Sequence, residues 1–200
     1  MAESEFILTL EGQKELLAKM DRLPASVREE VGQRTLLQGA ILLEGYIKEQ
    51  KLSGQVLHVR SGRLRASMAH DVTHEGQDLV ARIGPHVVYA RILELGGTIT
   101  ARNARNLTIP VGQALTPSGV PRYTARDLIS NPSLGGFKRT FFRRKKLYGV
   151  TPGGRAVVVF VLKPSITIKA YRYMRSSLAE KAQEIIALIV AAVERALKRL

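Results

Sequence analysis

Apolar residues recur at helical spacing along two long stretches of the chain. The first, Ala25 to Leu52, predicts one amphipathic helix. Its apolar positions are Val27, Val31, Leu37, Ile41 and Ile47. Gly32 and Gly39 lie on nearly one face and each cost about 1 kcal/mol relative to alanine. We therefore expect the backbone of another element to approach them closely and the helix to be tightly packed. The second stretch predicts a helix of about 30 residues over Tyr171–Leu200.

Shorter β-prone stretches are separated by turn residues. They are Phe6–Leu10, Met68–Thr73, Asp78–Gly84, Thr98–Thr100, Leu107–Ile109, Ala156–Leu162 and Ser165–Lys169. The second and third are expected to pair as a hairpin across residues 74–77. The continuously apolar run Ala156–Leu162 predicts a central strand that is buried on both faces.

Three short helical segments complete the pattern. Gln13–Leu23 is expected to be a helix that Pro24 ends, and Arg60–Ser67 is expected to hold a capped helical turn. A third helix is predicted to begin at Pro85 and to end at Gly96–Gly97, where one glycine adopts a positive φ.

Residues 111–154 break this regularity with four prolines and seven glycines. A segment of that length without structure is unusual inside a compact domain, so it is expected to be an excursion with a function. The order of elements predicts an α+β fold with an antiparallel sheet packed by the two long helices. We expect a single domain over residues 1–200, with the excursion at about 111–154 containing a long basic β-arm or loop.

Charge is distributed unevenly. The chain carries 31 basic and 17 acidic side chains, for a net charge of +14. Residues 1–50 have a net charge of −3, whereas residues 101–150 hold ten basic residues and one acid, Asp127. Such a chain is expected to bind polyanions: nucleic acid, an anionic membrane or an acidic protein.

The densest basic run is the one feature that resembles a site. It comprises Lys138, Arg139, Phe141, Phe142, Arg143, Arg144, Lys145 and Lys146. Mutual repulsion predicts that this stretch is mobile in isolation and ordered on assembly. We favour a protein neighbour over DNA because the two phenylalanines offer apolar anchors. A solvated hairpin without a partner is the alternative.

The sequence holds few other residues that point to catalysis or to the binding of a metal or cofactor. The absence of cysteine excludes disulfides and thiolate sites. His70 and His74 lie four residues apart on an expected strand, too far from each other to share a metal. No nucleotide-binding fingerprint or nucleophile arrangement is present. The sequence therefore predicts no catalytic residue, no metal and no cofactor. Without a basic signal segment or an apolar run of about 18 residues, we expect a soluble protein that does not contact a membrane.

Two motifs occur in order. Ser61–Ser67 reads SGRLRAS, and Val88–Thr98 reads VYARILELGGT after the expected hairpin. They resemble the "tG-x-Lr-x-S" turn and the "YA-x-x-lE-x-Gg-T" segment of the tail-completion, or head–tail joining, proteins of long-tailed bacteriophages. The similarity continues over Leu107–Pro110, Ala114–Tyr123 and Phe160–Ile168. One departure is Ala170–Tyr173, which lacks the family's proline before the last helix.

The resemblance implies a structural virion protein that completes the tail and joins it to the head at the neck. It implies a homo-oligomeric ring, made in the bacterial host cytoplasm, with portal or connector, tail-tube or tail-terminator proteins as partners. Two other roles stay open: tail terminator, and nonspecific nucleic-acid-binding protein.

The residues that match the family's motifs are expected to be structural. They are Gly62, Leu64, Tyr89, Glu94 and Gly96. Tyr89 and Leu93 are expected to pack the short helix on the sheet. The Glu94 carboxylate needs a partner among apolar neighbours, and Arg63 or Arg65 is the predicted one.

Overall fold

The structure is a computed structural model that describes residues 18–76 and 78–199. It confirms the α+β fold with long helices near both ends of the chain and antiparallel strand pairing. The strand predicted at Phe6–Leu10 lies outside the described residues, as does the start of the helix predicted at Gln13–Leu23, of which residues 18–20 are helical.

The chain divides into two compact units. Unit 1 comprises Met1–His58, Arg63–Glu94 and Tyr171–Leu200, and unit 2 comprises Val59–Gly62 and Leu95–Ala170. The single domain stays a prediction. Its expected excursion, residues 111–154, holds two strands and a short helix.

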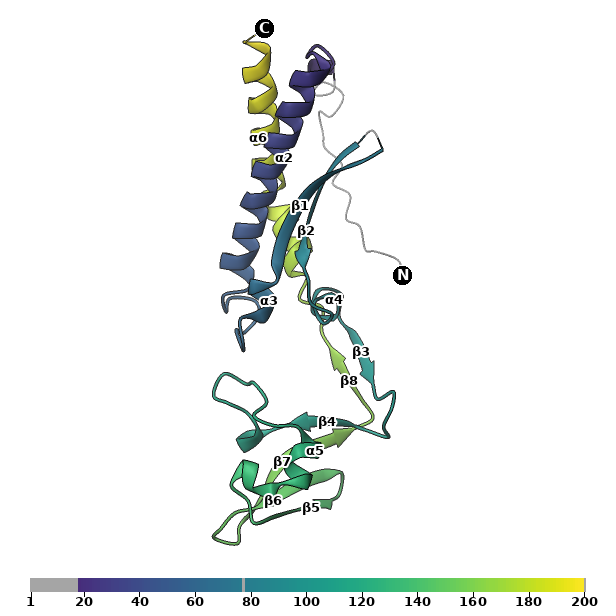
Figure 1. Cartoon of the computed structure of the whole chain (residues 1–200), viewed down its shortest axis with the longest axis vertical. Helices are drawn as coiled ribbons and strands as arrows, with labels where there is room; N and C mark the ends of the chain where they lie inside the picture. The colour runs from purple at the N-terminus through teal and green to yellow at the C-terminus, as the bar shows by residue number, and fades with distance from the viewer. Residues whose placement is uncertain (1–17, 77, 200) are drawn as a thin grey trace. The chain divides into compact units, whose positions relative to one another are not determined.

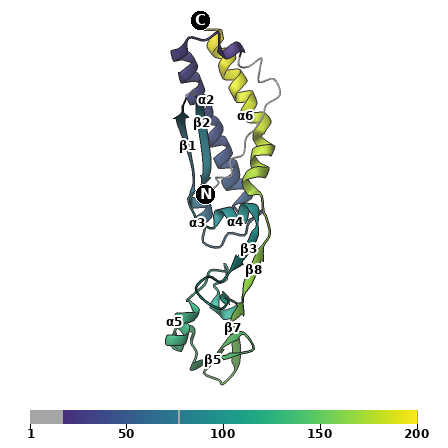
Figure 2. The ribbon, with the colours of Figure 1, turned by 90° about the vertical axis from the view of Figure 1, so that its right-hand side faces the viewer.

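Unit 1 is built on two long helices and a hairpin (Figures 1 and 2). Helix α2 (Ala25–Tyr46) continues into the π-helical turn η1 (Ile47–Lys51), and α6 spans Tyr173–Leu197. Strands β1 (Met68–Glu75) and β2 (Asp78–Pro85) pair antiparallel, as predicted. The short helices are α3 (Arg63–Ala66) and α4 (Ala90–Leu95). Helix α2 packs against α6 and against both strands of the hairpin.

Small residues determine which face of α2 is buried. Gly39 faces Ile185 of α6, where an added Cβ would lie 3.3 Å from that side chain, and Gly32 faces Leu79 of β2. Both glycines are thus packed against another element, but against its side chains rather than against the backbone expected from sequence. Close approach of the helices places the bulkier Leu37 and Ile41 on the other side of α2, where they are exposed rather than buried as predicted.

Ion pairs join α2 to its neighbours. The Glu44 carboxylate contacts His70 of β1 and Lys48, and Glu29 lies 2.6 Å from His74. Burial alone would raise the pKa of Glu44, but the hydrogen bonds with His70 and Lys48 hold it below its usual value. In η1, which continues α2, Lys51 lies 2.8 Å from Glu180 of α6.

Unit 2 contains two antiparallel sheets. Strands β3 (Gly97–Thr100) and β8 (Ser165–Ile168) form a two-stranded ladder. A four-stranded sheet has the order β4 (Leu107–Pro110), β7 (Ala156–Lys163), β6 (Lys146–Val150) and β5 (Arg139–Arg143). Within the described residues, the single sheet expected from sequence is replaced by three separate sheets, one in unit 1 and two in unit 2.

One face of the four-stranded sheet carries the core of unit 2. Helix α5 (Ala125–Ser130) lies on it (Figure 1), and Leu128 packs with Phe137, Leu147 and Phe160. The turns η2 (Gly112–Ala114) and η3 (Pro132–Gly135) flank this core. Strand β7 is central, as predicted, but only its middle residues Val159 and Phe160 are fully buried.

The helix after the hairpin begins later than predicted. Pro85 ends β2 rather than opening α4, because the chain continues as an extended strand until the His86 N–H donates to the Ser67 carbonyl (3.0 Å). Val88, which the predicted helix would have included, lies before α4 and is fully exposed. Gly96 and Gly97 both have a positive φ, which confirms the predicted stop.

Candidate functional site

The two units differ sharply in charge. Unit 2 holds 14 of the 31 basic side chains but only one of the 17 acidic ones, so its net charge is +13. Unit 1 holds the other 17 basic and 16 acidic side chains, for a net charge of +1. Nearly all of the excess positive charge of the protein therefore resides in unit 2.

The one acid of unit 2 is already engaged in a helix cap. Asp127 accepts hydrogen bonds from the backbone N–H and the hydroxyl of Thr124, while the Thr124 hydroxyl accepts from the Asp127 N–H. This reciprocal pair is a capping box at the start of α5. Hydrogen bonds from Thr124 lower the pKa of Asp127. The carboxylate thus stabilises a helix end and neutralises little of the surrounding charge.

The basic run from Lys138 to Lys146 forms the β5–β6 hairpin. Arg143 pairs with Lys146, so the turn consists of Arg144 and Lys145 alone. Both have a positive φ, 46° and 59°, as a two-residue hairpin turn of the I′ type requires. The β6 strand also pairs with β7, so the stretch expected to order only on assembly has its backbone paired within the chain.

The turn sequence is unusual for its conformation. Asn-Gly and Asp-Gly dominate such turns, because the left-handed region costs about 1 kcal/mol or more for a residue with a Cβ. Here two cations occupy it. The Lys145 carbonyl accepts a hydrogen bond from the Leu162 N–H of β7 (2.8 Å), which holds the turn in place. Residues held in such conformations cluster at functional sites.

The two phenylalanines of the hairpin lie on opposite faces of the sheet, because neighbouring strand residues alternate. Phe141 stacks on Tyr148 with ring centroids 5.2 Å apart, and the Arg139 guanidinium lies 5.9 Å from the Phe141 ring centroid. Phe142 is 56% exposed. Only one of the two predicted anchors is therefore open to a partner.

Phe142 lines a shallow hollow of about 400 Å³ beside α5. Ile129, which is 46% exposed, and Arg126 line it from the helix, and Thr108 lines it from β4. The hollow thus combines exposed apolar surface with a cation, and Arg143 follows Phe142 along β5. Sequence analysis missed Ile129 and Arg126, because only the fold brings α5 beside the hairpin.

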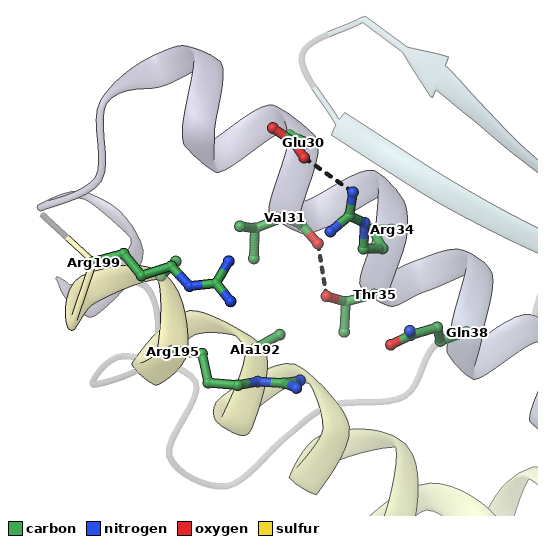
Figure 3. Close-up of a pocket in the computed structure, with 9 residues that line it drawn as sticks. Glu30, Val31, Arg34, Thr35, Gln38, Ala192, Arg195 and Arg199 are labelled. Carbon is green, nitrogen blue, oxygen red and sulfur yellow. Dashed lines mark hydrogen bonds and ion pairs between the residues drawn. The ribbon is translucent and has the colours of Figure 1, made fainter.

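A second hollow, of about 210 Å³, lies between α2 and α6 (Figure 3). Its polar groups largely interact within their own helices. Arg34 pairs with Glu30 (3.1 Å), the Thr35 hydroxyl donates to the Val31 carbonyl (2.6 Å), and the Arg195 Nε donates to the carbonyl of Ala191. We assign this hollow to helix packing.

The residues of the two sequence motifs have mainly structural positions. Gly62 has a φ of 70° before α3. Leu64 and Leu93 pack against the core cluster of unit 1 that includes Met68 and Tyr173. Tyr89, in contrast, is 42% exposed, so it packs less than predicted.

Gly96 occupies the most restricted of these positions. It combines a φ of 70° with a close approach of backbone, since an added Cβ would lie 2.7 Å from the Ala170 nitrogen. A side chain therefore does not fit at this position without a shift of the backbone.

Glu94 has partners that the sequence did not suggest. Its carboxylate is buried and accepts the backbone N–H groups of Met174 (2.9 Å) and Arg175 (3.0 Å). These are early amides of α6, whose N-cap residue, Arg172, provides no side-chain cap. Glu94 thus caps a helix from 80 residues away, where its charge also favours the helix dipole. The sequence did hold one signal of such a distant cap: no Ser, Thr, Asp or Asn stands before α6 to cap it locally.

Titratable side chains do not gather into a metal site. Within residues 18–76 and 78–199, no group of three His, Asp or Glu side chains could hold a metal ion. His70 and His74 each contact a glutamate of α2 instead. No helix in this described part is long and apolar enough to cross a membrane.

Comparison with known protein families places a match in the first half of the chain. Residues 14–96 match a family model described as "Bacteriophage HK97-gp10, putative tail-component". The match includes α2, the β1–β2 hairpin and both sequence motifs up to Gly96, so it confirms the resemblance to phage tail proteins over that segment. No curated protein and no solved structure matches the chain.

Proposed function

We propose that this chain, whose residues 14–96 match a family of bacteriophage tail components, is a structural virion protein that completes the tail and joins it to the head at the neck. The family match carries the proposal. The similarity of later segments, such as Leu107–Pro110 and Phe160–Ile168, to head–tail joining proteins supports the finer role. A location in the virion tail follows from it.

The hollow beside α5 is the proposed contact with a neighbour. Exposed aromatic and aliphatic side chains in a pocket are typical anchors of protein interfaces. Phe142 and Ile129 provide them, and Arg126 favours an acidic partner. Portal or connector, tail-tube and tail-terminator proteins are the candidate neighbours. A homo-oligomeric ring is the expected assembly, because closed cyclic symmetry limits a structural protein to a defined number of copies.

Two other roles remain as alternatives. The first is a tail terminator, which would likewise be a basic α+β protein that forms a ring. A nonspecific nucleic-acid-binding protein of the host, outside any virion, draws support from the net charge of +13 on unit 2.

The test is a phage in which the gene is deleted and then supplied in trans. We expect the deletion to yield separate heads and tails in electron micrographs, and the wild-type gene to restore joined particles. Joined, infectious particles without the gene would overturn the proposed function.

Complementation with Phe142→Ser tests the hollow. Leu134→Ser is the matched control, because Leu134 is equally exposed, 56%, but does not line the hollow. We expect Phe142→Ser to fold, by thermal unfolding, yet to leave heads and tails apart, while the control restores joining. Equal joining by both variants would exclude the hollow as the contact.

A further inference from the structure

We propose that one end of the four-stranded sheet binds the phosphate backbone of duplex DNA without sequence specificity. We call this surface the basic end and define it by Arg143, Arg144, Lys145, Lys146 and Lys163. This inference goes beyond the proposed function and does not depend on it, because it rests on strand register and charge alone.

Strand register brings these five residues together. Arg143 pairs with Lys146 across the hairpin, and Lys146 pairs with Val161 of β7. Lys163 ends β7 opposite Leu107, the first residue of β4. Because neighbouring strands are antiparallel, the end of β5, the start of β6 and the end of β7 lie at the same edge of the sheet. All five side chains are exposed.

Unit 2 lacks the acidic side chains that would neutralise this edge. Its only carboxylate, Asp127, serves in the cap of α5. Two further cations, Arg102 and Arg105, lie on the connection that enters β4 at the same edge. Such a concentration of positive charge displaces cations condensed on the DNA phosphates, and the release of those cations is the main source of nonspecific affinity for DNA.

The tip of the hairpin is held within the sheet, level with the end of β7. Lys146 pairs with Val161, and the Lys145 carbonyl accepts the Leu162 N–H (2.8 Å), so the cations of the turn lie at the same edge as Lys163. The Phe141–Tyr148 stack stiffens the hairpin behind its tip. Arg144 and Lys145 accept an unfavourable backbone conformation at that tip, which is explained if cations are needed there.

DNA fits the basic end better than an acidic protein does. Protein interfaces place apolar and aromatic residues at their centre and exclude charge from it. From Arg143 to Lys146 the tip presents only cations, and the exposed apolar side chains Phe142 and Ile129 belong to the separate hollow. The defining residues are Arg and Lys alone, and such dense cations contact phosphates in a duplex of any sequence, so contacts with phosphate are expected to dominate.

The test measures binding of the purified full-length chain to a mixed-sequence duplex of about 30 base pairs by fluorescence anisotropy, from 50 to 300 mM NaCl. Five phosphate contacts predict a slope of log Kobs against log salt of about −4.5. Changing Arg143, Arg144, Lys145 and Lys146 together to Gln should make the slope shallower by about 3.6 and weaken binding at 100 mM salt at least about 100-fold.

The control variant removes the same charge from unit 1. Arg22, Arg65, Arg91 and Lys198 are exposed and lie outside the basic end, so their change to Gln should leave the slope nearly unchanged. Equal losses in both variants would show that total charge, not the basic end, binds DNA and would overturn the proposal. So would a failure of the wild-type chain to bind the duplex at 50 mM salt, or tighter binding of poly-glutamate than of DNA, which would assign the surface to an acidic protein.

Discussion

At the scale of single residues, Glu94 shows that a motif residue can stabilise a helix that lies far from it in the sequence. A buried carboxylate amid apolar residues needs a partner, and this argument correctly predicted that Glu94 has one. Spacing alone suggested an arginine of the preceding motif. The observed donors, the amides of Met174 and Arg175, belong to the last helix, and only the fold brings them within 3.0 Å.

Substitution of Glu94 tests this cap. Glu94→Gln keeps one accepting oxygen but turns its NH2 donor toward the second amide, and it loses the charge that favours the helix dipole. We therefore expect a loss of about 1–2 kcal/mol in the free energy of unfolding. Glu94→Ala leaves two buried amides without an acceptor and should cost about 2–3 kcal/mol. Chemical denaturation measures both losses. A variant with Ala that is as stable as wild type would show that the cap contributes nothing.

At the scale of elements, the sequence pattern predicted which helices and strands form better than it predicted which of them pack together. The β1–β2 hairpin and β7 were predictable because alternation and a continuous apolar run determine strand type. The apolar spacing of α2 identified the helix but not its buried face, since Gly39 and Ala40 approach their neighbours more closely than Leu37 or Ile41 could. The hollow beside Phe142 was unpredictable for a related reason: Ile129 comes from a helix that only tertiary packing brings to the hairpin.

Substitutions in the β5–β6 turn are expected to change the stability of the protein and its binding of DNA in opposite directions. Replacing Arg144 by Asn and Lys145 by Gly supplies the preferred residues for two positive φ angles. We therefore expect the free energy of unfolding to rise by about 1–2 kcal/mol. The same change removes two cations from the basic end and should flatten the salt slope of DNA binding by about 1.8. A drop in stability would contradict the turn conformation, and an unchanged slope would contradict the role of these two residues.

At the scale of the whole molecule, the segregation of charge is the feature most relevant to function. The sequence already showed an excess of basic residues after Ala101, and this prediction could be made from counting alone. The sequence could not show that residues 59–62 belong to unit 2. Nor could it show that all but one of the acidic side chains belong to unit 1. The family match lies mainly in the nearly neutral unit, whose last helix it leaves out, whereas the basic end and the hollow belong to the other unit.

The central claim is that this protein is a structural part of the phage neck. Its most direct measurement is the position of the chain in purified virions, by gold labelling of an epitope-tagged copy and quantitative mass spectrometry. The account predicts label at the junction between head and tail and a fixed, small number of copies in each particle. Complete virions without the chain, or with label confined to another part of the particle, would contradict it.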